Sequence, residues 1–218
     1  MIRGVIFDMD GLMFDTERAS MQVWDQQLAK HGWTFTPQLG NAIRGCNDAG
    51  ICSTLTQAYG PGFEYVPVRD GVRTGLIRLL DTQGMPVKPG LRELLAWLRE
   101  QGIPCAVASS SRRVTVEHHC AHAGVLDAFD HLVCGDMVTH SKPDPEIFCK
   151  AAQLLGVEPA ECLVLEDSFN GVRAGAAGGF VTVMVPDMDQ PTPEIQALYT
   201  HRADSLLDVL EWLKSGRL

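Results

Sequence analysis

The sequence lacks the features that mark secreted, membrane-bound or nucleic-acid-binding proteins. None of its apolar runs approaches the roughly 18 residues that a transmembrane helix needs. The first predicted strand begins at residue 2, so we expect no signal peptide. With 18 basic against 27 acidic residues, the formal charge is −9, and no run of Lys and Arg could neutralise consecutive phosphates. We therefore expect neither a membrane nor a nucleic acid as a partner.

Regular cysteine spacing is also missing. The seven cysteines are odd in number, scattered, and contain no CxxC pair. This pattern does not predict a disulfide framework, and it is typical of a reducing compartment, so we expect a cytoplasmic protein. Internal repeats and low-complexity segments are absent as well. The 218 residues therefore suffice for one large domain or for a core with a smaller insertion, and the oligomeric state stays open.

Short apolar runs rich in β-branched residues predict five buried strands of a parallel sheet. They cover residues 2–8, 103–109, 131–135, 162–167 and 181–186. Helical patterns lie between them, at residues 89–102, 112–124 and 144–156. Alternation of strands and helices predicts a doubly wound, Rossmann-like α/β core with a parallel sheet.

From about residue 14 to residue 85 the chain has no strand pattern and shows helical periodicity instead. The segment "GMPVKPG", with two prolines and two glycines, suits the linker that returns from this insertion. We therefore predict an α/β core domain of residues 1–13 and 86–218, and an α-helical cap domain of residues 14–85. Because open α/β sheets bind ligands at the carboxyl ends of their strands, an insertion at that point is expected to act as a lid.

The first predicted strand ends in "DMDG", with two aspartates one residue apart. In an extended segment Asp8 and Asp10 project to the same side, and Gly11 allows a sharp exit from the strand. Two carboxylates ~4 Å apart repel by roughly 1 kcal/mol in water and about 4 kcal/mol at an effective dielectric of 20. A bound cation or a proton on one acid must therefore compensate.

The fourth predicted strand also ends in adjacent acids, Glu166 and Asp167. If it lies beside the first strand, three or four carboxylates meet at one edge of the sheet, which suits Mg²⁺. Alternatively, the two acids only cap the helix that follows. Their occurrence together with Asp8 and Asp10 favours the metal site.

Two further segments carry groups suited to phosphate. The second strand ends in "SSS", where hydroxyls and the N–H groups of a helix start could bind an anion or simply cap that helix. Lys142 precedes a helix predicted to have Asp144 as N-cap and Pro145 at its first position. A lysine held there could bind phosphate as a point charge, although an ordinary surface lysine is the simpler alternative.

The motifs "DMDG", "ASSS", "SKPDP" and "LEDS" occur in this order, each after a predicted strand. Together they resemble the haloacid dehalogenase superfamily, and within it the branch of helical-cap phosphatases and β-phosphoglucomutase-like enzymes. The resemblance spans essentially the whole chain. It implies that Asp8 attacks phosphorus to form an aspartyl-phosphate and that Asp10 acts as general acid and base. Ser109 and Lys142 would hold the phosphoryl oxygens.

The resemblance also implies a Mg²⁺ cofactor, bound by Asp8, the backbone carbonyl of Asp10 and Asp167, with Glu166 either a direct ligand or one step removed. Further candidates for substrate or phosphate binding are Gly11, Ser110 and, in the insertion, Arg44. The predicted function is therefore that of a Mg²⁺-dependent phosphatase acting on a small phosphomonoester, such as a sugar phosphate.

Two alternatives remain open. A β-phosphoglucomutase carries a histidine shortly after the "DT" pair and an arginine in a cap loop, whereas this chain has Ser20 and Asp48 at the matching positions. A non-enzymatic phospho-aspartate acceptor, like a response-regulator receiver, would also place an Asp, a Ser and a Lys on such a sheet. The insertion of about 70 residues and the acid two positions after Asp8 argue against the acceptor.

A cluster of histidines is a second candidate metal site. His118 and His122 are four residues apart on one predicted helix, with His119 beside them, and this spacing can hold zinc. A structural zinc site needs two more ligands, and none is evident nearby in the sequence. We therefore expect these histidines to be packed or solvated.

Overall fold

The computed structural model describes residues 2–44, 46 and 48–218. The chain forms two compact units, Met1–Phe14 with Val87–Leu218 and Asp15–Pro86. The larger unit holds a helix-covered parallel sheet, and the described part of the smaller unit is helical. The predicted α/β class with a helical insertion is therefore confirmed, while the role of the insertion as a lid stays a prediction.

All six strands in the described part of the chain belong to one parallel sheet with the order β3-β2-β1-β4-β5-β6. Their bounds are β1 Gly4–Phe7, β2 Cys105–Ser109, β3 His131–Cys134, β4 Cys162–Glu166, β5 Val181–Met184 and β6 His201–Arg202. Ile6 of β1 lies opposite Ala106 of β2 on one side and Val164 of β4 on the other. The strand order reverses at β1, so the carboxyl ends of β2, β1 and β4 are neighbours.

The five predicted strands are all present, each shorter than its apolar run. β1, β2 and β4 are buried along their whole length, which explains why they read as continuous apolar segments. The sixth strand, β6, was missed. It has only two residues, His201 and Arg202, and neither is fully buried, so no apolar run marks it.

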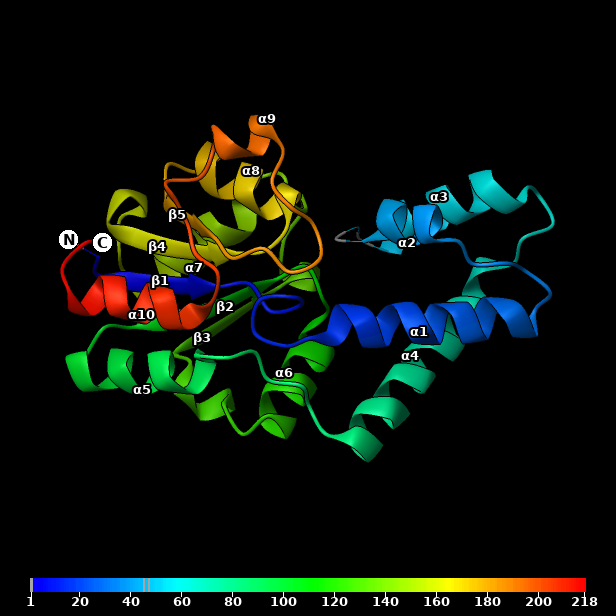
Figure 1. The fold of residues 1–218 in the computed structure, drawn as a ribbon, viewed down its shortest axis with the longest axis horizontal. Helices are drawn as coiled ribbons and strands as arrows, with labels where there is room; N and C mark the ends of the chain where they lie inside the picture. The colour runs from blue at the N-terminus through cyan, green and yellow to red at the C-terminus, as the bar shows by residue number, and fades with distance from the viewer. Residues whose placement is uncertain (1, 45, 47) are drawn as a thin grey trace. The chain divides into compact units, whose positions relative to one another are not determined.

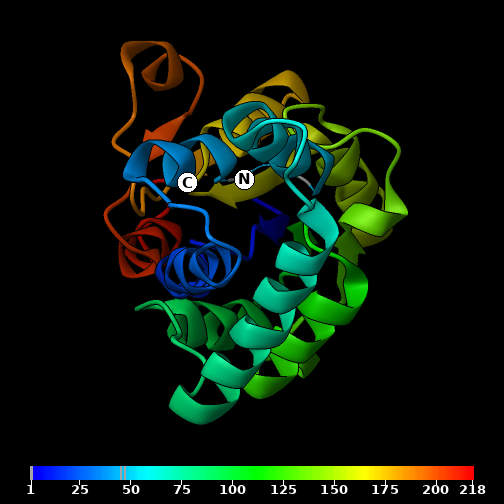
Figure 2. The same ribbon diagram turned by 90° about the vertical axis from the view of Figure 1, so that its right-hand side faces the viewer.

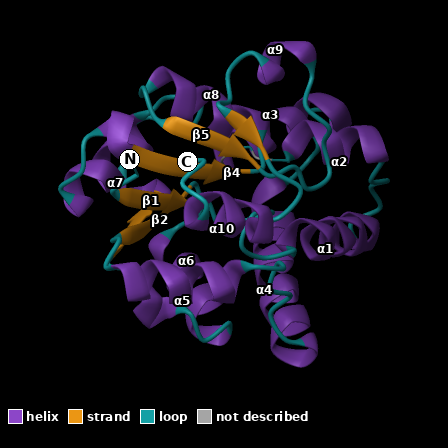
Figure 3. Ribbon diagram, turned by 60° about the vertical axis from the view of Figure 1, so that its left-hand side comes forward, coloured by secondary structure: helices purple, strands orange, loops and turns teal. Residues whose placement is uncertain are grey.

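Helices cover both faces of the sheet. They are α5 Leu91–Gln101, α6 Arg113–His122, α7 Glu146–Leu155, α8 Phe169–Ala177, α9 Pro193–Gln196 and α10 Leu206–Lys214, with short turns η1 Leu126–Ala128, η2 Gly135–Met137 and η3 Pro159–Glu161. In Figure 3, α5, α6 and α10 lie on one side of the strands and α7 and α8 on the other. On the second face, Phe148 of α7 packs in the core cluster with Ile6 and Val164.

The predicted start of α7 was wrong by one position. The helix begins at Glu146, with Pro145 rather than Asp144 as the N-cap residue. Asp144 still serves the helix start, because its Oδ1 accepts a hydrogen bond of 2.9 Å from the backbone N–H of Glu146. The Asp144 side chain thus caps the helix from the residue before the N-cap, not from the N-cap itself as predicted.

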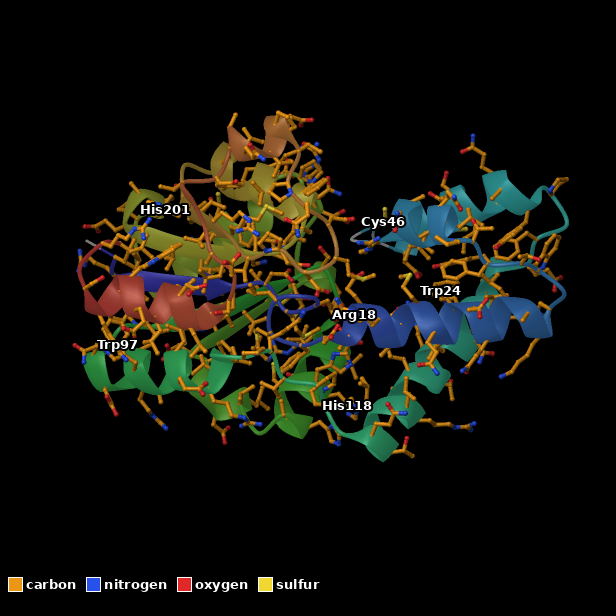
Figure 4. All side chains as sticks on the ribbon, viewed as in Figure 1. Arg18, Trp24, Cys46, Trp97, His118 and His201 are labelled. Carbon is orange, nitrogen blue, oxygen red and sulfur yellow. The ribbon has the colours of Figure 1, made fainter. Side chains whose placement is uncertain are left out.

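The smaller unit contains α1 Thr16–Lys30, α2 Pro37–Ile43, α3 Asp48–Tyr59 and α4 Tyr65–Gln83. Figure 2 shows α1 nearly end-on with α4 running past it. At their contact, Gly75 lies so close to α1 that an added Cβ would be 2.7 Å from Val23 Cγ1. Trp24 projects from α1 towards α2 and α3 (Figure 4) and belongs to an apolar cluster that includes Leu28 and Leu55. This unit therefore has an apolar core of its own.

The two linkers run beside each other in the larger unit. Phe14 and Val87 form an antiparallel bridge, and the backbone N–H of Lys88 donates to the carbonyl of Met13 at 2.9 Å. The Lys88 ammonium also lies 2.6 Å from Asp187 Oδ1, in the loop after β5. The returning linker is thus tied both to the departing one and to the loop after β5. Among the described residues, no helix combines the length and the apolar character that crossing a membrane requires.

The start of α5 packs closely against α10, and this contact can be tested by mutation. Gly90 has a φ of 89°, and an added Cβ would lie 2.5 Å from the backbone nitrogen of Leu207 in α10. Gly102 at the other end of α5 also has a positive φ of 66°, but a Cβ there would meet nothing within 4 Å. Both alanine variants incur the left-handed penalty of about 1–2 kcal/mol, and only Gly90→Ala adds a backbone overlap.

We therefore expect Gly90→Ala to lower the free energy of unfolding more than Gly102→Ala does. Urea unfolding followed by circular dichroism would measure the difference. Equal losses in the two variants would contradict the close approach of α5 and α10.

Candidate active site

The strand order places the predicted site residues of the larger unit at one edge of the sheet. Figure 1 shows the arrow of β1 ending at this edge. The residues come from the last positions of β2 and β4 and from the loops after β1, β2, β3 and β4: Asp8, Asp10, Gly11, Ser109, Ser110, Lys142, Glu166 and Asp167. Because the strands are parallel and β1 lies between β2 and β4, loops distant in sequence start next to one another.

Lys142 is the centre of this arrangement. Its ammonium group donates hydrogen bonds to Asp8 Oδ1 at 2.5 Å, Glu166 Oε1 at 2.7 Å and the Ala108 carbonyl at 3.0 Å. It also lies 4.7 Å from the centre of the Phe148 ring, and the side chain is only 4% exposed. Each of its three protons has an acceptor, so Lys142 is not the ordinary surface lysine of the alternative interpretation.

The cluster carries more negative charge than Lys142 neutralises. Asp8 is 7% exposed and Glu166 is fully buried, and both share the single ammonium group. Burial raises the pKa of Asp8 from 3.8 to about 8; Lys142 opposes this rise, and the charges of Glu166 and Asp10 add to it. Burial alone would lower the pKa of Lys142, but the two carboxylates raise it above its ordinary value. The site therefore favours a proton or a cation beside Asp8.

Glu166 connects Lys142 to the helix after β4. Its Oε2 accepts hydrogen bonds from the N–H and the hydroxyl of Ser168, at 2.8 and 2.9 Å. Ser168, not Glu166 or Asp167, is the N-cap of α8 and accepts from the N–H of Gly171. A Cβ on Gly171 would lie 1.7 Å from Glu166 Oε1. The helix-capping alternative therefore does not explain the two acids, because capping falls to the next residue.

Asp167 lies against the turn that leaves β1. Gly11 has a φ of 88°, and a Cβ there would lie 2.2 Å from Asp167 Oδ2. Glycine at this position therefore permits both the left-handed backbone and the close approach of the carboxylate. The predicted role of Gly11 in the exit from the strand agrees with this geometry.

The serine turn after β2 contacts the second aspartate. Ser111 Oγ donates to Asp10 Oδ2 at 2.9 Å, and the N–H of Ser111 donates to Ser109 Oγ at 3.0 Å. Ser110 lies between them, and its carbonyl oxygen would be 2.1 Å from a Cβ on Gly135. Ser111 was not singled out from the sequence. The signal was the third serine of "SSS", but a serine run does not show which hydroxyl faces the acids.

The donor set fits a hard divalent cation. Asp8, Glu166 and Asp167 each offer a carboxylate oxygen, and these oxygens lie within 4.8 Å of one another. Oxygen ligands of this charge suit Mg²⁺, and a cation would offset the excess negative charge around Asp8. The residues present therefore fit the predicted cofactor.

A second acidic cluster lies at the surface, formed by His140, Asp144 and Glu146. Glu146 accepts hydrogen bonds from the backbone N–H groups of Thr139 at 2.8 Å and His140 at 2.7 Å. These two backbone hydrogen bonds are the main reason why the pKa of Glu146 is lowered. The cluster holds the loop that leads to Lys142, and its geometry is explained without a metal.

The predicted residues of the insertion are tied to one another within the smaller unit. Arg44 Nε lies 3.5 Å from Glu17 Oε2, and its Nη2 donates to Asn41 Oδ1. Ser20 is half-buried on α1. Asp48 accepts a hydrogen bond of 2.6 Å from the Tyr65 hydroxyl.

Asp48 also forms ion pairs with two arginines of α4, Arg69 at 3.3 Å and Arg73 at 3.4 Å. The mutase pattern has an arginine in place of this aspartate. Arg69 and Arg73, the arginines that contact this position, are therefore paired with the Asp48 carboxylate.

The histidine cluster is largely explained by packing. His119 is 2% exposed, and its ring meets Phe14 edge to face at 6.4 Å. Burial lowers the pKa of His119, partly opposed by the charge of Asp10. The rings of His118 and His122 stack at 6.0 Å, and Figure 4 labels His118 on α6. Neither of the two ligand clusters found in the described residues includes these histidines.

A doubly wound sheet with acids and a lysine at its carboxyl edge defines a class of α/β enzymes that act at the ends of their strands. The family model of the haloacid dehalogenase-like hydrolases matches residues 2–179, so the chain belongs to this family. The family predicted from the four motifs is therefore confirmed.

Known proteins agree with this assignment. A bifunctional riboflavin kinase/FMN phosphatase of Arabidopsis thaliana is 32% identical over 212 residues, which cover 94% of this chain and 54% of that protein. The chain thus spans about half the length of this relative. The fructose-1-phosphate phosphatase YqaB of Escherichia coli is 30% identical over 183 residues, covering 84% of this chain and 95% of that protein. These relatives support the predicted enzyme class, a phosphoric monoester hydrolase.

The fold is shared with a β-phosphoglucomutase of Clostridium difficile. Its structure superimposes with a TM-score of 0.84 at 22% identity, covering 99% of this chain and 96% of that one. At this level of identity the likeness establishes the common fold only.

The raised pKa of Asp8 predicts a pH dependence of stability. The folded protein holds the Asp8 proton more tightly than the unfolded chain does, since the pKa rises from 3.8 to about 8 on folding. Asp8 therefore favours folding fully below about pH 4, and this contribution is lost as the pH rises towards 8. We expect metal-free wild type to lose stability relative to Asp8→Asn over this range.

Urea unfolding of both proteins in a chelator, at about pH 5 and about pH 8, would measure this difference. Asp127→Asn, which changes an exposed acid, is the matched control and should follow the wild type. Parallel pH dependence in wild type and Asp8→Asn would contradict the raised pKa.

Proposed function

We propose that the protein is a Mg²⁺-dependent phosphatase that hydrolyses a small phosphomonoester through an aspartyl-phosphate on Asp8. The observation that carries this proposal is the buried lysine shared by two carboxylates, with a third and a fourth acid alongside. A phosphoryl group brings negative charge to the site, so it requires both the lysine and a cation.

Asp8 is suited to be the nucleophile. The hydrogen bond from Lys142 to Oδ1 fixes the orientation of the carboxylate at the end of β1. Attack of Asp8 on phosphorus breaks the ester bond, and Asp10 gives its proton to the leaving oxygen. Asp10 then takes a proton from water, which attacks the aspartyl-phosphate and releases inorganic phosphate. Asp8 and Asp10 return to their starting states.

Ser109 and Lys142 would hold the phosphoryl oxygens. Ser109 is 1% exposed at the tip of β2, and its oxygen accepts from the N–H of Ser111, so the hydroxyl can donate its own proton to phosphate. Lys142 contributes a fixed positive charge. We include Gly11 and Ser110, which line the same edge, in the phosphate-binding set.

Asp8, the Asp10 carbonyl and Asp167 would hold Mg²⁺. When bound, the cation neutralises charge on the phosphoryl group and on the carboxylates around it. Both oxygens of Glu166 receive hydrogen bonds from Lys142 and Ser168, so we assign Glu166 to positioning Lys142, one step removed from the metal. Gly171 leaves the space that Glu166 occupies.

A sugar phosphate or similar metabolite is the proposed substrate. Support comes from the relative that is named a fructose-1-phosphate phosphatase. Asp48 supports a phosphatase over a mutase, because the arginine of the mutase pattern is replaced here by a carboxylate, which pairs with Arg69 and Arg73. The proposal also includes a cytoplasmic location, which agrees with seven free cysteines, and no nucleic-acid partner.

The mechanism predicts a strict need for two aspartates. Phosphate release from an aryl phosphate should require Mg²⁺, and Asp8→Asn should lower turnover by roughly 10³-fold or more because the nucleophile is gone. Asp10→Asn should lower it by roughly 10²- to 10⁴-fold, because hydrolysis of the aspartyl-phosphate loses its general base whatever the leaving group. Asp127→Asn, an exposed acid outside the site, should leave the rate unchanged. Turnover of Asp8→Asn at the wild-type rate would contradict the mechanism.

Product analysis separates a phosphatase from a mutase. Incubation with β-glucose 1-phosphate should release inorganic phosphate if the substrate is accepted, because water is the final acceptor. Accumulation of glucose 6-phosphate would instead assign the enzyme to the mutases. A panel of phosphorylated metabolites assayed for phosphate release would then identify the preferred leaving group.

A further inference from the structure

We propose that Ser111 is a positioning residue that holds the carboxyl group of Asp10 in the orientation needed for proton transfer to the leaving group. The inference rests on the proposed function, because it concerns the acid and base of that reaction. Its basis is the hydrogen bond of 2.9 Å from Ser111 Oγ to Asp10 Oδ2, which joins the loop after β2 to the loop after β1.

The Ser111 hydroxyl sits on a fixed backbone. The Ser111 N–H donates to Ser109 Oγ at 3.0 Å, and the Ser111 carbonyl accepts from the N–H of Gly135 at 2.9 Å. The residue is therefore anchored both to the tip of β2 and to η2, the turn after β3. A side chain held in this way can orient a partner, because its own position costs little additional entropy.

The turn beneath Ser111 is tightly packed. A Cβ on Gly135 would lie 2.1 Å from the Ser110 carbonyl oxygen, so the two backbones touch directly. Asp136 Oδ1 accepts from the N–H of Arg113 at 3.1 Å and holds the first turn of α6 to the same η2 segment. The serine turn and η2 thus form one support, from which the Ser111 hydroxyl reaches Asp10.

Helix capping does not account for Ser111. The N-cap of α6 is Arg112, which makes no side-chain cap, and the first helical N–H bonds to Asp136. The Ser111 hydroxyl instead donates across 101 residues of sequence to an aspartate. A serine that served only the helix start would direct its oxygen to a backbone N–H of α6.

Asp10 benefits from such a constraint because it must act twice, first as acid and then as base. Its carboxyl is only half-buried, unlike that of Asp8, which Lys142 holds. Small errors in the position of a catalytic group can cost roughly 10²-fold in rate. Loss of one hydrogen bond to a charged group corresponds to roughly 10- to 100-fold.

The test compares leaving groups. Protonation by Asp10 matters greatly for an alkyl phosphate such as glycerol phosphate and little for p-nitrophenyl phosphate, whose leaving group is stable as an anion. Ser111→Ala should therefore lower kcat/KM by roughly 10- to 100-fold for the alkyl phosphate and at most a few-fold for p-nitrophenyl phosphate. Ser111→Thr, which keeps the hydroxyl, should retain most of the wild-type kcat/KM for the alkyl phosphate.

Thr115→Ala, which removes a hydroxyl from the first turns of α6, is the matched control. It should leave the ratio of kcat/KM for the two substrates unchanged. An equal loss on both substrates, or no loss, in Ser111→Ala would overturn the inference. Circular dichroism would show whether Ser111→Ala folds. If it does not, Ser111→Gly removes the same hydroxyl, and its ratio of kcat/KM for the two substrates decides the test. Failure of the wild type to release phosphate with Mg²⁺ would contradict the proposed function itself and is distinguished by that measurement.

Discussion

The site depends on one buried ammonium group shared by two buried carboxylates. A charge removed from water is tolerated only when it is paired and hydrogen-bonded, and Lys142 meets this condition through Asp8, Glu166 and the Ala108 carbonyl. The neighbouring structure is arranged around these contacts: Phe148 lies beside the ammonium group, and Gly171 leaves room for Glu166. The pair of acids still exceeds the single lysine in charge, and this excess is what makes the site receptive to a cation.

The same arrangement imposes a strict register on the sheet. Because side chains alternate between the two faces of a strand, a slip of one residue in β1 would turn Asp8 away from Lys142. The pairing of Phe7 with Val107 and Leu165 prevents that slip and keeps the loops after β2 and β4 on either side of Asp8. Packing of the buried strands therefore sets the geometry of the polar groups that follow them.

Much of the fold was predictable because its signals are local. Strands buried on both faces read as apolar runs, and the four motifs at their ends identified the family. The errors have equally local causes. β6 lacks an apolar run because its two residues are not fully buried, and the start of α7 was placed one residue early because Asp144 caps from outside the helix. Ser111 was missed because a run of serines does not reveal which hydroxyl turns towards Asp10.

By itself the sequence determined the α/β class, the family, and the chemical types of the groups at the strand ends. These follow from periodicity and from short motifs, which depend on residues close together in the chain. Only the tertiary structure decided which atoms pair: Lys142 reaches Asp8 across 134 residues of sequence and Glu166 across 24. Such pairings depend on strand order and register, and on whether a glycine such as Gly171 leaves the necessary space. No local pattern contains that information.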